Sequence, residues 1–328
     1  MHPISRRLTA FGLAAGTLAF CAWPLAAHAQ ATYPDKPIRF VVPYPPGGGT
    51  DVIARIVQEK FGQALGQPIV IDNRGGAAGS LGTDVVAKSA PDGYTVLFTL
   101  SSHTINPAIY PKLPFDTVKD FAPIGTVASL PQILVANLRF PANTVAELTA
   151  LAKAKPGTLS FASVGNGSPG HLAGELYKLR TGTQLVHVPY RGGGPAVTDV
   201  MGGQVPLLWV SIPAAAQFVK TGKLKALAVS TTKRSAAFPD VPTMQEAGVP
   251  DFEVDSWYAM FVPAKTPKPI IDKLNRALND VVHQADIKDK LLAQGSEGVG
   301  GTPEALGKIV GSELVRWAKL AKDAGIRL

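Results

Sequence analysis

Residues 38–56 read IRFVVPYPPGGGTDVIARI, and this stretch decides the fold class. The apolar run at its start predicts a buried strand, and the apolar spacing from Val52 to Phe61 predicts a helix. Three glycines, Gly47 to Gly49, lie between the two. A strand, a glycine-rich loop and a helix in this order bring the free N–H groups of the helix N-terminus to the end of the strand. The stretch therefore predicts an α/β unit that can hold an anion.

The same order of elements recurs along the chain, at 158–182 and at 184–211. The segment 100–110, LSSHTINPAIY, is expected to be a loop with polar side chains at a strand's end. The tail from 266 onward is expected to be mostly helical. Repeated strand–helix units predict mostly parallel sheets with helices on both faces. Ligands of such sheets bind beyond the carboxyl ends of the strands.

The loop VPYPPGGGTD at 42–51 has an echo, VPYRGGGPAVTD, at 188–199. Coincidence in a chain with 33 glycines and 28 prolines is one explanation. The other is that two lobes each present one such loop to a shared cleft. We expect one lobe to comprise 32–132 and 256–328, and the other to comprise 133–255.

The N-terminal residues 1–31 have the pattern of a secretory signal peptide that is removed on export. Arg6 and Arg7 precede an apolar run that ends in AHA. The only cysteine, Cys21, lies in this leader and follows Phe20, where a lipoprotein would have a small residue. Without the leader the chain carries 30 Lys and Arg against 24 Asp and Glu, a net charge of +6. No basic cluster indicates nucleic acid, whereas a diffuse positive field suits a small anionic ligand.

Sequence motifs of enzymes are missing from the chain. The glycines at 47–49 are not followed by the Gly-Lys-Ser/Thr of a nucleotide P-loop, and they do not fit Gly-x-Gly-x-x-Gly. The sequence around Ser168 approaches a nucleophile elbow, but Asn166 stands where glycine is required. The histidines of the mature chain show no zinc-ligand spacing. We therefore predict no enzymatic activity, no catalytic residue, no metal and no cofactor.

Each candidate loop also has a purely structural interpretation. The triple glycine can be a tight turn with Thr50 or Asp51 as N-cap, and Asn73 can form an Asx turn. Segment 163–171, SVGNGSPGH, holds more hydrogen-bond donors than a turn needs, and this favours a role in ligand binding. Asp199 would repel a carboxylate, so we expect it to orient a loop or to accept from a ligand amine or hydroxyl. The polar side chains at 101–103 can simply be hydrogen-bonded within their own loop. Arg191 can be a charge that is solvated at the edge of the cleft.

These motifs together resemble the periplasmic receptors of tripartite tricarboxylate transporters, the Bug or TctC-type solute-binding proteins. The matching stretches run in order from about Tyr33 to the C-terminus. They are YPDKPIRFVVPYPPGGGTD, IVIDNRGGAAGSLG, DGYTVLF, SVGNGSPGHLAGELY, VPYRGGGPAVTDVMGGQV, LKALAVST with FPDVPTMQEAGVPDFE, and WYAMFVPAKTP. The Pro45–Pro46 pair departs from the family pattern, which has small residues there.

The resemblance implies a two-lobed type II periplasmic-binding fold, each lobe a mostly parallel sheet flanked by helices, with the ligand cleft between the lobes. It implies a periplasmic receptor of a Gram-negative bacterium, expected to be a monomer. Such a receptor delivers a small organic anion to inner-membrane transporter subunits; the anion is a di- or tricarboxylate, an acidic amino acid or an aromatic acid. A ligand sensor that feeds a signalling partner is the alternative. The ligand contacts that the resemblance implies are Tyr44, Pro46, Gly47, Gly48, Gly49, Thr50, Asn73, Ala78, Ser101, Ser102, His103, Ser163, Gly165, Asn166, Gly167, Ser168, Tyr190, Arg191 and Asp199.

Overall fold

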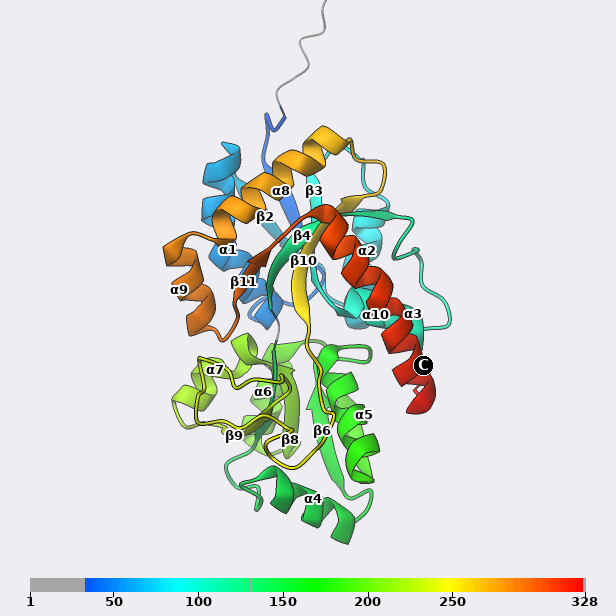
Figure 1. Ribbon diagram of the computed structural model, residues 1–328, viewed down its shortest axis with the longest axis vertical. Helices are drawn as coiled ribbons and strands as arrows, with labels where there is room; N and C mark the ends of the chain where they lie inside the picture. Colours follow the sequence, from blue (N-terminus) through cyan, green and yellow to red (C-terminus); the bar gives the residue numbers. More distant parts are fainter. Residues whose placement is uncertain (1–32, 130, 327–328) are drawn as a thin grey trace, which may run out of the picture. The chain divides into compact units, whose positions relative to one another are not determined.

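Two β-sheets flanked by helices make up the part of the chain that the computed structural model describes, residues 33–129 and 131–326 (Figure 1). The predicted signal peptide, including Cys21, lies outside the described residues. Within these residues, no helix is both long enough and apolar enough to cross a membrane.

The first sheet has the strand order β11-β4-β10-β3-β1-β2. Neighbouring strands β1, β2 and β3 are parallel, whereas β10 lies between β3 and β4 and runs antiparallel to both. β11 is antiparallel to β4. The strands are β1 (Ile38–Val42), β2 (Ile69–Asn73), β3 (Thr95–Leu100), β4 (Phe121–Ser129), β10 (Trp257–Pro263) and β11 (Gly298–Gly300).

Helices cover both faces of this sheet because its strands are apolar on both sides. Phe40 and Val42 pack on one face with α1 (Gly49–Leu65), α8 (Lys268–Val282) and α9 (Ala285–Ala293). Val41, which points the other way in the pleat, packs with α2 (Ser80–Ala87) and α10 (Pro303–Asp323).

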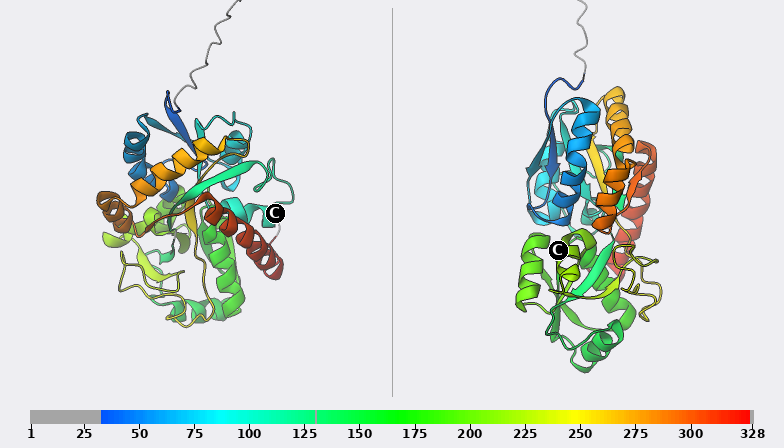
Figure 2. Two further views of the ribbon diagram at one scale, coloured as in Figure 1. Left: turned by 45° about the horizontal axis from the view of Figure 1, so that its top comes forward. Right: turned by 90° about the vertical axis from the view of Figure 1, so that its left-hand side faces the viewer.

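The second sheet has the order β7-β6-β8-β5-β9, in which only β5 runs against its neighbours. Its strands are β5 (Gln132–Ala136), β6 (Leu159–Ser163), β7 (Leu185–Pro189), β8 (Leu207–Ser211) and β9 (Lys225–Val229). Leu208 and Val210 pack with α6 (Gly193–Gly202) and α7 (Ile212–Lys220). Trp209, on the other face, packs with α5 (Pro169–Thr181) and α4 (Val145–Ala154). Figure 2 shows the green and yellow-green elements gathered around this sheet.

The chain passes between the sheets twice, from β4 to β5 and from β9 to β10. The two crossings are neighbours, because Trp257 at the start of β10 pairs with Ser129 at the end of β4. Buried Glu313 of α10 anchors the second crossing. Its carboxylate accepts hydrogen bonds from Trp257 Nε1 at 3.0 Å and from Thr104 Oγ1 at 2.6 Å. The second crossing therefore starts from a residue that is hydrogen-bonded to α10.

The segment 100–110, expected to be a loop, is largely helical: α3 spans Ser102–Ile109 with Pro107 inside it. Proline cannot donate to the carbonyl four residues earlier, which is that of His103. Thr117 Oγ1 donates to this carbonyl instead, at 3.1 Å. The expectation of a loop was wrong, because a residue from a distant segment supplies the donor that the proline lacks.

Candidate ligand-binding site

A small cavity lies where the two glycine loops of the sequence echo meet. It is about 30 Å³ in volume, which is room for a water molecule but not for a dicarboxylate. Among the residues that the structure describes, no charged side chain lines it. Its walls are Tyr44, Pro45, Gly48, Gly49, Thr50 and Leu100 from the first sheet's side, and Gln132, Val164, Pro169, Gly192, Gly193, Ser211 and Ala214 from the second.

The loops from the two sides are in contact across this cavity. A Cβ atom at Gly192 would lie 3.0 Å from the ring of Pro45, and one at Gly49 would overlap Ser211 Oγ and lie 2.8 Å from Tyr258 Oη. The absence of a Cβ at these glycines permits the close approach of their backbone to side chains. A ligand larger than water therefore enters only when the loops move apart.

Three helices begin at the cavity without a side-chain cap. They are α1 after Gly48, α6 after Gly192 and α7 after Ser211. The first-turn amides of a helix have no partner inside the helix, and the helix dipole makes this end electropositive. Uncapped N-termini that converge on a cavity with uncharged walls favour an anion.

Buried hydroxyl groups lie beside the cavity on the first sheet's side. Tyr44 Oη faces the hydroxyls of Ser102 and Thr99, and Tyr258 Oη faces the hydroxyl of Ser211. Burial raises the pKa of Tyr44 to about 12 and also raises the pKa of Tyr258. Both phenols therefore remain protonated at neutral pH and can donate a hydrogen bond.

The first glycine loop is held by the buried carboxylate of Asp51. Its Oδ2 accepts from Gly47 N and from Arg55 Nε, each at 2.9 Å, and its Oδ1 accepts from Asn73 Nδ2 at 3.1 Å. The same Asn73 amide group donates to Tyr44 O at 3.0 Å. Neither Asp51 nor Thr50 caps α1, because its N-cap is Gly48. Asn73 thus shapes the loop and does not line the cavity.

The second-sheet loop 163–168 uses most of its donors internally. Gly165 N donates to Ser163 Oγ at 3.1 Å, Ser168 N to Gly165 O at 3.2 Å, and Gly167 N to His171 Nδ1 at 3.2 Å. Ser168 Oγ caps α5 by accepting from His171 N. Val164 and Pro169, rather than the predicted polar residues between them, face the cavity.

Two stacked histidines pack against this loop. The rings of His171 and His187 lie 4.1 Å apart, and His187 Nε2 is 2.7 Å from Ser163 Oγ. Because His171 Nδ1 accepts from Gly167 N–H, its ring proton lies on Nε2, which faces Glu175 at 3.9 Å. The geometry needs His171 to be neutral.

We expect the stability of the protein to fall between pH 6.5 and pH 4. Burial lowers the pKa of His171 to about 4 and that of His187 to about 3, whereas both titrate near 6.5 when unfolded. The unfolded state therefore takes up protons first as the pH falls. The unfolding free energy should drop by up to roughly 1.4 kcal/mol per pH unit for each histidine. Urea unfolding at pH 7, 6 and 5 measures this slope. His187→Gln should reduce the slope and exposed His283→Gln should not; equal slopes in all three proteins would contradict the assignment.

Tyr190 and Asp199 form a second loop anchor. Tyr190 Oη donates to Asp199 Oδ2 at 2.7 Å, so Asp199 orients the loop, one of the two roles expected for it. Arg191, next to Tyr190, is exposed. Among the residues described, it forms no hydrogen bond or ion pair, and it is free to meet an anion that approaches from solvent.

The other predicted contacts are spread around the cavity. Of the 19 predicted residues, only Tyr44, Gly48, Gly49 and Thr50 line it. His103 is buried among Phe115, Phe121 and Phe261 instead. Three more are occupied by protein contacts: Ser101 Oγ bonds Ser256 Oγ, Ala78 O accepts from Asn106, and Asn166 O accepts from Tyr110. Pro46 and Gly47 are exposed on the outer side of the loop.

Several wall residues were missed by the sequence analysis. Gly192 and Gly193 belong to the echo loop, so the echo itself could have identified them. Gln132 and Ser211 stand at the ends of β5 and β8, 79 positions apart in the chain but directly paired in the sheet. No local pattern points to such a pair.

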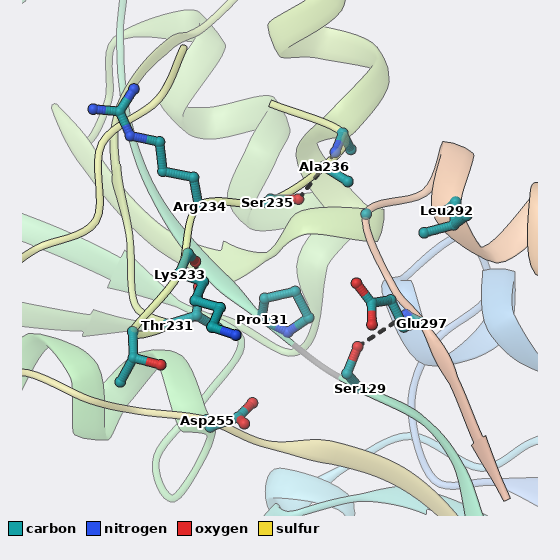
Figure 3. A pocket seen from close by; sticks show the side chains of 13 residues that line it. Ser129, Pro131, Thr231, Lys233, Arg234, Ser235, Ala236, Asp255, Leu292 and Glu297 are labelled. Carbon is teal, nitrogen blue, oxygen red and sulfur yellow. Dashed lines mark hydrogen bonds between the residues drawn. The ribbon is translucent and has the colours of Figure 1, made fainter. Parts of the chain in front are cut away.

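A second pocket, of about 210 Å³, lies beside the two crossings (Figure 3). It contains no predicted site residue. Asp255 and Glu297 line it together with Lys233 and Ser129, and Ser129 Oγ accepts from Glu297 N at 2.9 Å. Its two carboxylates balance the cations of Lys233 and Arg234, and Arg234 is paired with Glu246, so the pocket offers no net positive charge to an anion. Among the described residues, no group of three or more His, Cys, Asp or Glu side chains could hold a metal ion.

Comparison with known proteins assigns the family. Residues 53–326 match the model of the tripartite tricarboxylate transporter family receptor. The chain is 38% identical to protein BugT of Bordetella pertussis over 99% of both chains. The solved periplasmic binding protein BugD is 36% identical, with a TM-score of 0.87 over 90% of this chain and 100% of its own. A solved structure of Rpa4515 from R. palustris with adipate is 35% identical, with a TM-score of 0.88 over the same shares.

These likenesses confirm the predicted two-lobed α/β fold of a periplasmic binding protein, a class of proteins that bind solutes and are not enzymes. The resemblance noted in the sequence is confirmed as well. The chain belongs to the tripartite tricarboxylate transporter receptor family, and it is a solute-binding receptor of the Bug type.

Proposed function

We propose that the protein captures a small carboxylate-bearing solute between its lobes in the periplasm and delivers it, as a monomer, to the inner-membrane subunits of a tripartite transporter. The convergence of three uncapped helix N-termini on a cavity without charged walls carries this proposal. The adipate in the related Rpa4515 structure supports the ligand class. The lobes are assigned to 32–132 with 256–328 and to 133–255, and 1–31 to a cleaved export signal.

Neutral donors are sufficient for useful affinity. A hydrogen bond to a charged group contributes roughly 1.5–3 kcal/mol, and a helix N-terminus adds about 0.3–1 kcal/mol, up to about 2 when partly buried. Three or four such contacts reach the roughly −8 kcal/mol of micromolar binding, before ordering costs are subtracted. A carrier also has to release its cargo, and dispersed neutral donors allow this more readily than a buried ion pair.

We expect purified receptor to bind at least one carboxylic acid in calorimetry, with equal affinity in the presence and absence of a metal chelator. The protein should be unfolded and refolded first, so that ligand carried through purification is removed. The panel should contain dicarboxylates, tricarboxylates, acidic amino acids and aromatic acids, with a neutral sugar as control. Binding of the sugar alone, or strict dependence on a divalent ion, would overturn the proposal.

Ligand binding should also shift the receptor from an open to a closed form. The two adjacent crossings, near 128–136 and 255–258, are the proposed hinge. Small-angle scattering with a saturating acid should then give a smaller radius of gyration than the refolded ligand-free protein. An identical radius of gyration in both samples would indicate a rigid pocket and would count against the hinge.

A further inference from the structure

A groove of about 420 Å³ adjoins the cavity between the glycine loops. Ala214 lines both spaces, and Gly47 and Gly194 in the groove are the chain neighbours of Gly48 and Gly193 in the cavity. The other walls of the groove come from α6 and from α1, α7 and the end of α9, which lie on the same side of the molecule in Figure 1. A groove of this volume can take up a small acid, whereas the cavity cannot.

The partition between the groove and the cavity is made of small residues. A Cβ atom at Gly193 would lie 3.9 Å from Gly48 Cα of the opposite loop and 3.2 Å from the methyl group of Ala214. Loops without side chains can part without moving a bulky group. Elsewhere the two loops meet through the ring of Pro45, which closes against the backbone of Gly192. The partition therefore obstructs an incoming acid less than the contact at Pro45 does.

Lys220 is the one charged side chain among the described residues that line the groove. Its Nζ donates to Ala293 O, at the end of α9, at 2.9 Å and lies 5.7 Å from the centre of the Phe238 ring. An ammonium group has three N–H donors, so two remain for a carboxylate that enters the groove. Val52 and Val197 also line the groove, and their apolar side chains suit the hydrocarbon part of an acid.

We propose that this groove is the entrance to the ligand-binding site, and that Lys220 binds the carboxylate there before it reaches the cavity. The proposal rests on the proposed function, because it concerns the route of the same acid. When the glycine loops part, the acid passes the partition and exchanges Lys220 for the N-terminal amides of α1, α6 and α7. Lys220 thus acts on the rate of capture, whereas the amides determine the affinity of the closed form.

Narrowing the groove tests the route. Gly194 lines the groove, and a Cβ there would meet no atom within 4 Å, so Gly194→Leu adds a side chain to the groove without a clash. Stopped-flow measurements with succinate, adipate, glutamate and benzoate give both rates for each acid that binds. Association and dissociation should each slow about tenfold while Kd stays within about twofold, because an obstacle on the path raises the barrier in both directions.

Gly202→Leu is the matched control for the route. Gly202 also belongs to α6, and a Cβ there would likewise meet no atom within 4 Å, but it lines neither the groove nor the cavity. This variant should keep both wild-type rates. Circular dichroism verifies that the two variants fold.

Removing the ammonium group tests the role of Lys220. Lys220→Met should associate about threefold more slowly at low ionic strength, and the difference should shrink as added salt screens the charge. Lys220→Arg, which keeps the charge and the donors, should restore the wild-type rate. Lys223→Met is the matched control, because Lys223 is exposed, carries the same charge and does not line the groove.

The outcomes separate this proposal from the proposed function. Unchanged rates in Gly194→Leu, or a raised Kd at an unchanged association rate, would overturn the entrance. An unchanged association rate in Lys220→Met, or an equal loss in Lys223→Met, would overturn the role of Lys220. These results would leave the carboxylate receptor intact, because the wild type still binds its acid. Failure of the wild type to bind any acid of the calorimetric panel would overturn both.

Discussion

Replacing Gly167 by valine is expected to abolish ligand binding while the protein stays folded. Gly167 has a φ of +75°, which costs a β-branched residue about 1–3 kcal/mol of strain. Its Cβ would also overlap Asn106 Oδ1 and lie 2.7 Å from Ile109 Cδ1, both on α3. Valine forces either the buried ends of the Asn106 and Ile109 side chains to shift or the loop to move away from α3, and both changes disturb the closed arrangement of the loop. We expect an affinity loss of at least about a hundredfold, or about 2.7 kcal/mol.

Ligand titration and circular dichroism on the same preparation measure this effect. Gly202→Val is the matched control, because Gly202 is exposed at the end of α6 and a Cβ there would meet no atom within 4 Å. It should bind like the wild type. Unchanged affinity in Gly167→Val would show that the loop does not take part in closure. Gly48 would be a weaker choice, since its φ of −78° suits any residue and its nearest neighbour would be 3.5 Å away.

Replacing Asp51 by asparagine is expected to cost about 2 kcal/mol of stability and to weaken ligand binding at least about tenfold. Asp51 is buried, and it accepts hydrogen bonds from the Gly47 amide, the Arg55 guanidinium and the Asn73 amide. Hydrogen bonds to a charged group contribute about 1.5–3 kcal/mol each, but Arg55 is half exposed and regains water when its partner is lost. An asparagine at this position would also turn an N–H group toward one of these donors. The loop that carries Gly48 and Gly49 would lose its anchor.

The pH dependence provides a second measurement on Asp51. Although burial acts to raise it, the hydrogen bonds from Arg55, Gly47 and Asn73 hold the pKa of Asp51 below its ordinary value of 3.8. A carboxylate whose pKa is lowered by folding stabilises the protein at pH values above its pKa in the unfolded state. That contribution is lost as the pH falls through its pKa in the folded state. Asp51→Asn should therefore lose stability at pH 7 and show a flatter decline below pH 4.

Urea unfolding at pH 7 and pH 3, together with calorimetry at pH 7, measures both effects. Asp286→Asn is the control, because this side chain is 46% exposed and its ion pairs with Lys60 and Lys290 are 3.7 and 3.9 Å long. Exposed pairs contribute about 1 kcal/mol or less. If Asp51→Asn were no more destabilising than this control, the carboxylate would not be the anchor of the loop.

The elements that the sequence predicted correctly depend on neighbours in the chain. The apolar run before Tyr44, the glycines after it and the apolar spacing from Val52 to Phe61 appear in the structure as β1, a loop and α1. Other local features follow the same rule: Thr144 and Glu147, three positions apart, form a capping box at the start of α4. Backbone angles, helix caps and strand pleats respond to residues only a few positions away.

The site depended on residues that are remote in the chain. Glycine loops that can approach an anion are visible in the sequence, but whether their N–H groups face the cleft or turn inward is not. At 163–168 those groups bond to Ser163, Gly165 and His171. Likewise, His103 is polar by type but is enclosed by Phe115, Phe121 and Phe261 from other segments.

The sequence by itself therefore determined the α/β units and the presence of two glycine loops, because these follow from local periodicity and conformational freedom. Only the tertiary structure decided which atoms line the cavity. Ser211 and Gln132 reach the cavity because sheet pairing brings them together there. A hydrogen bond is directional and short, so its partner is decided by the packing of distant segments rather than by the residue type at one position.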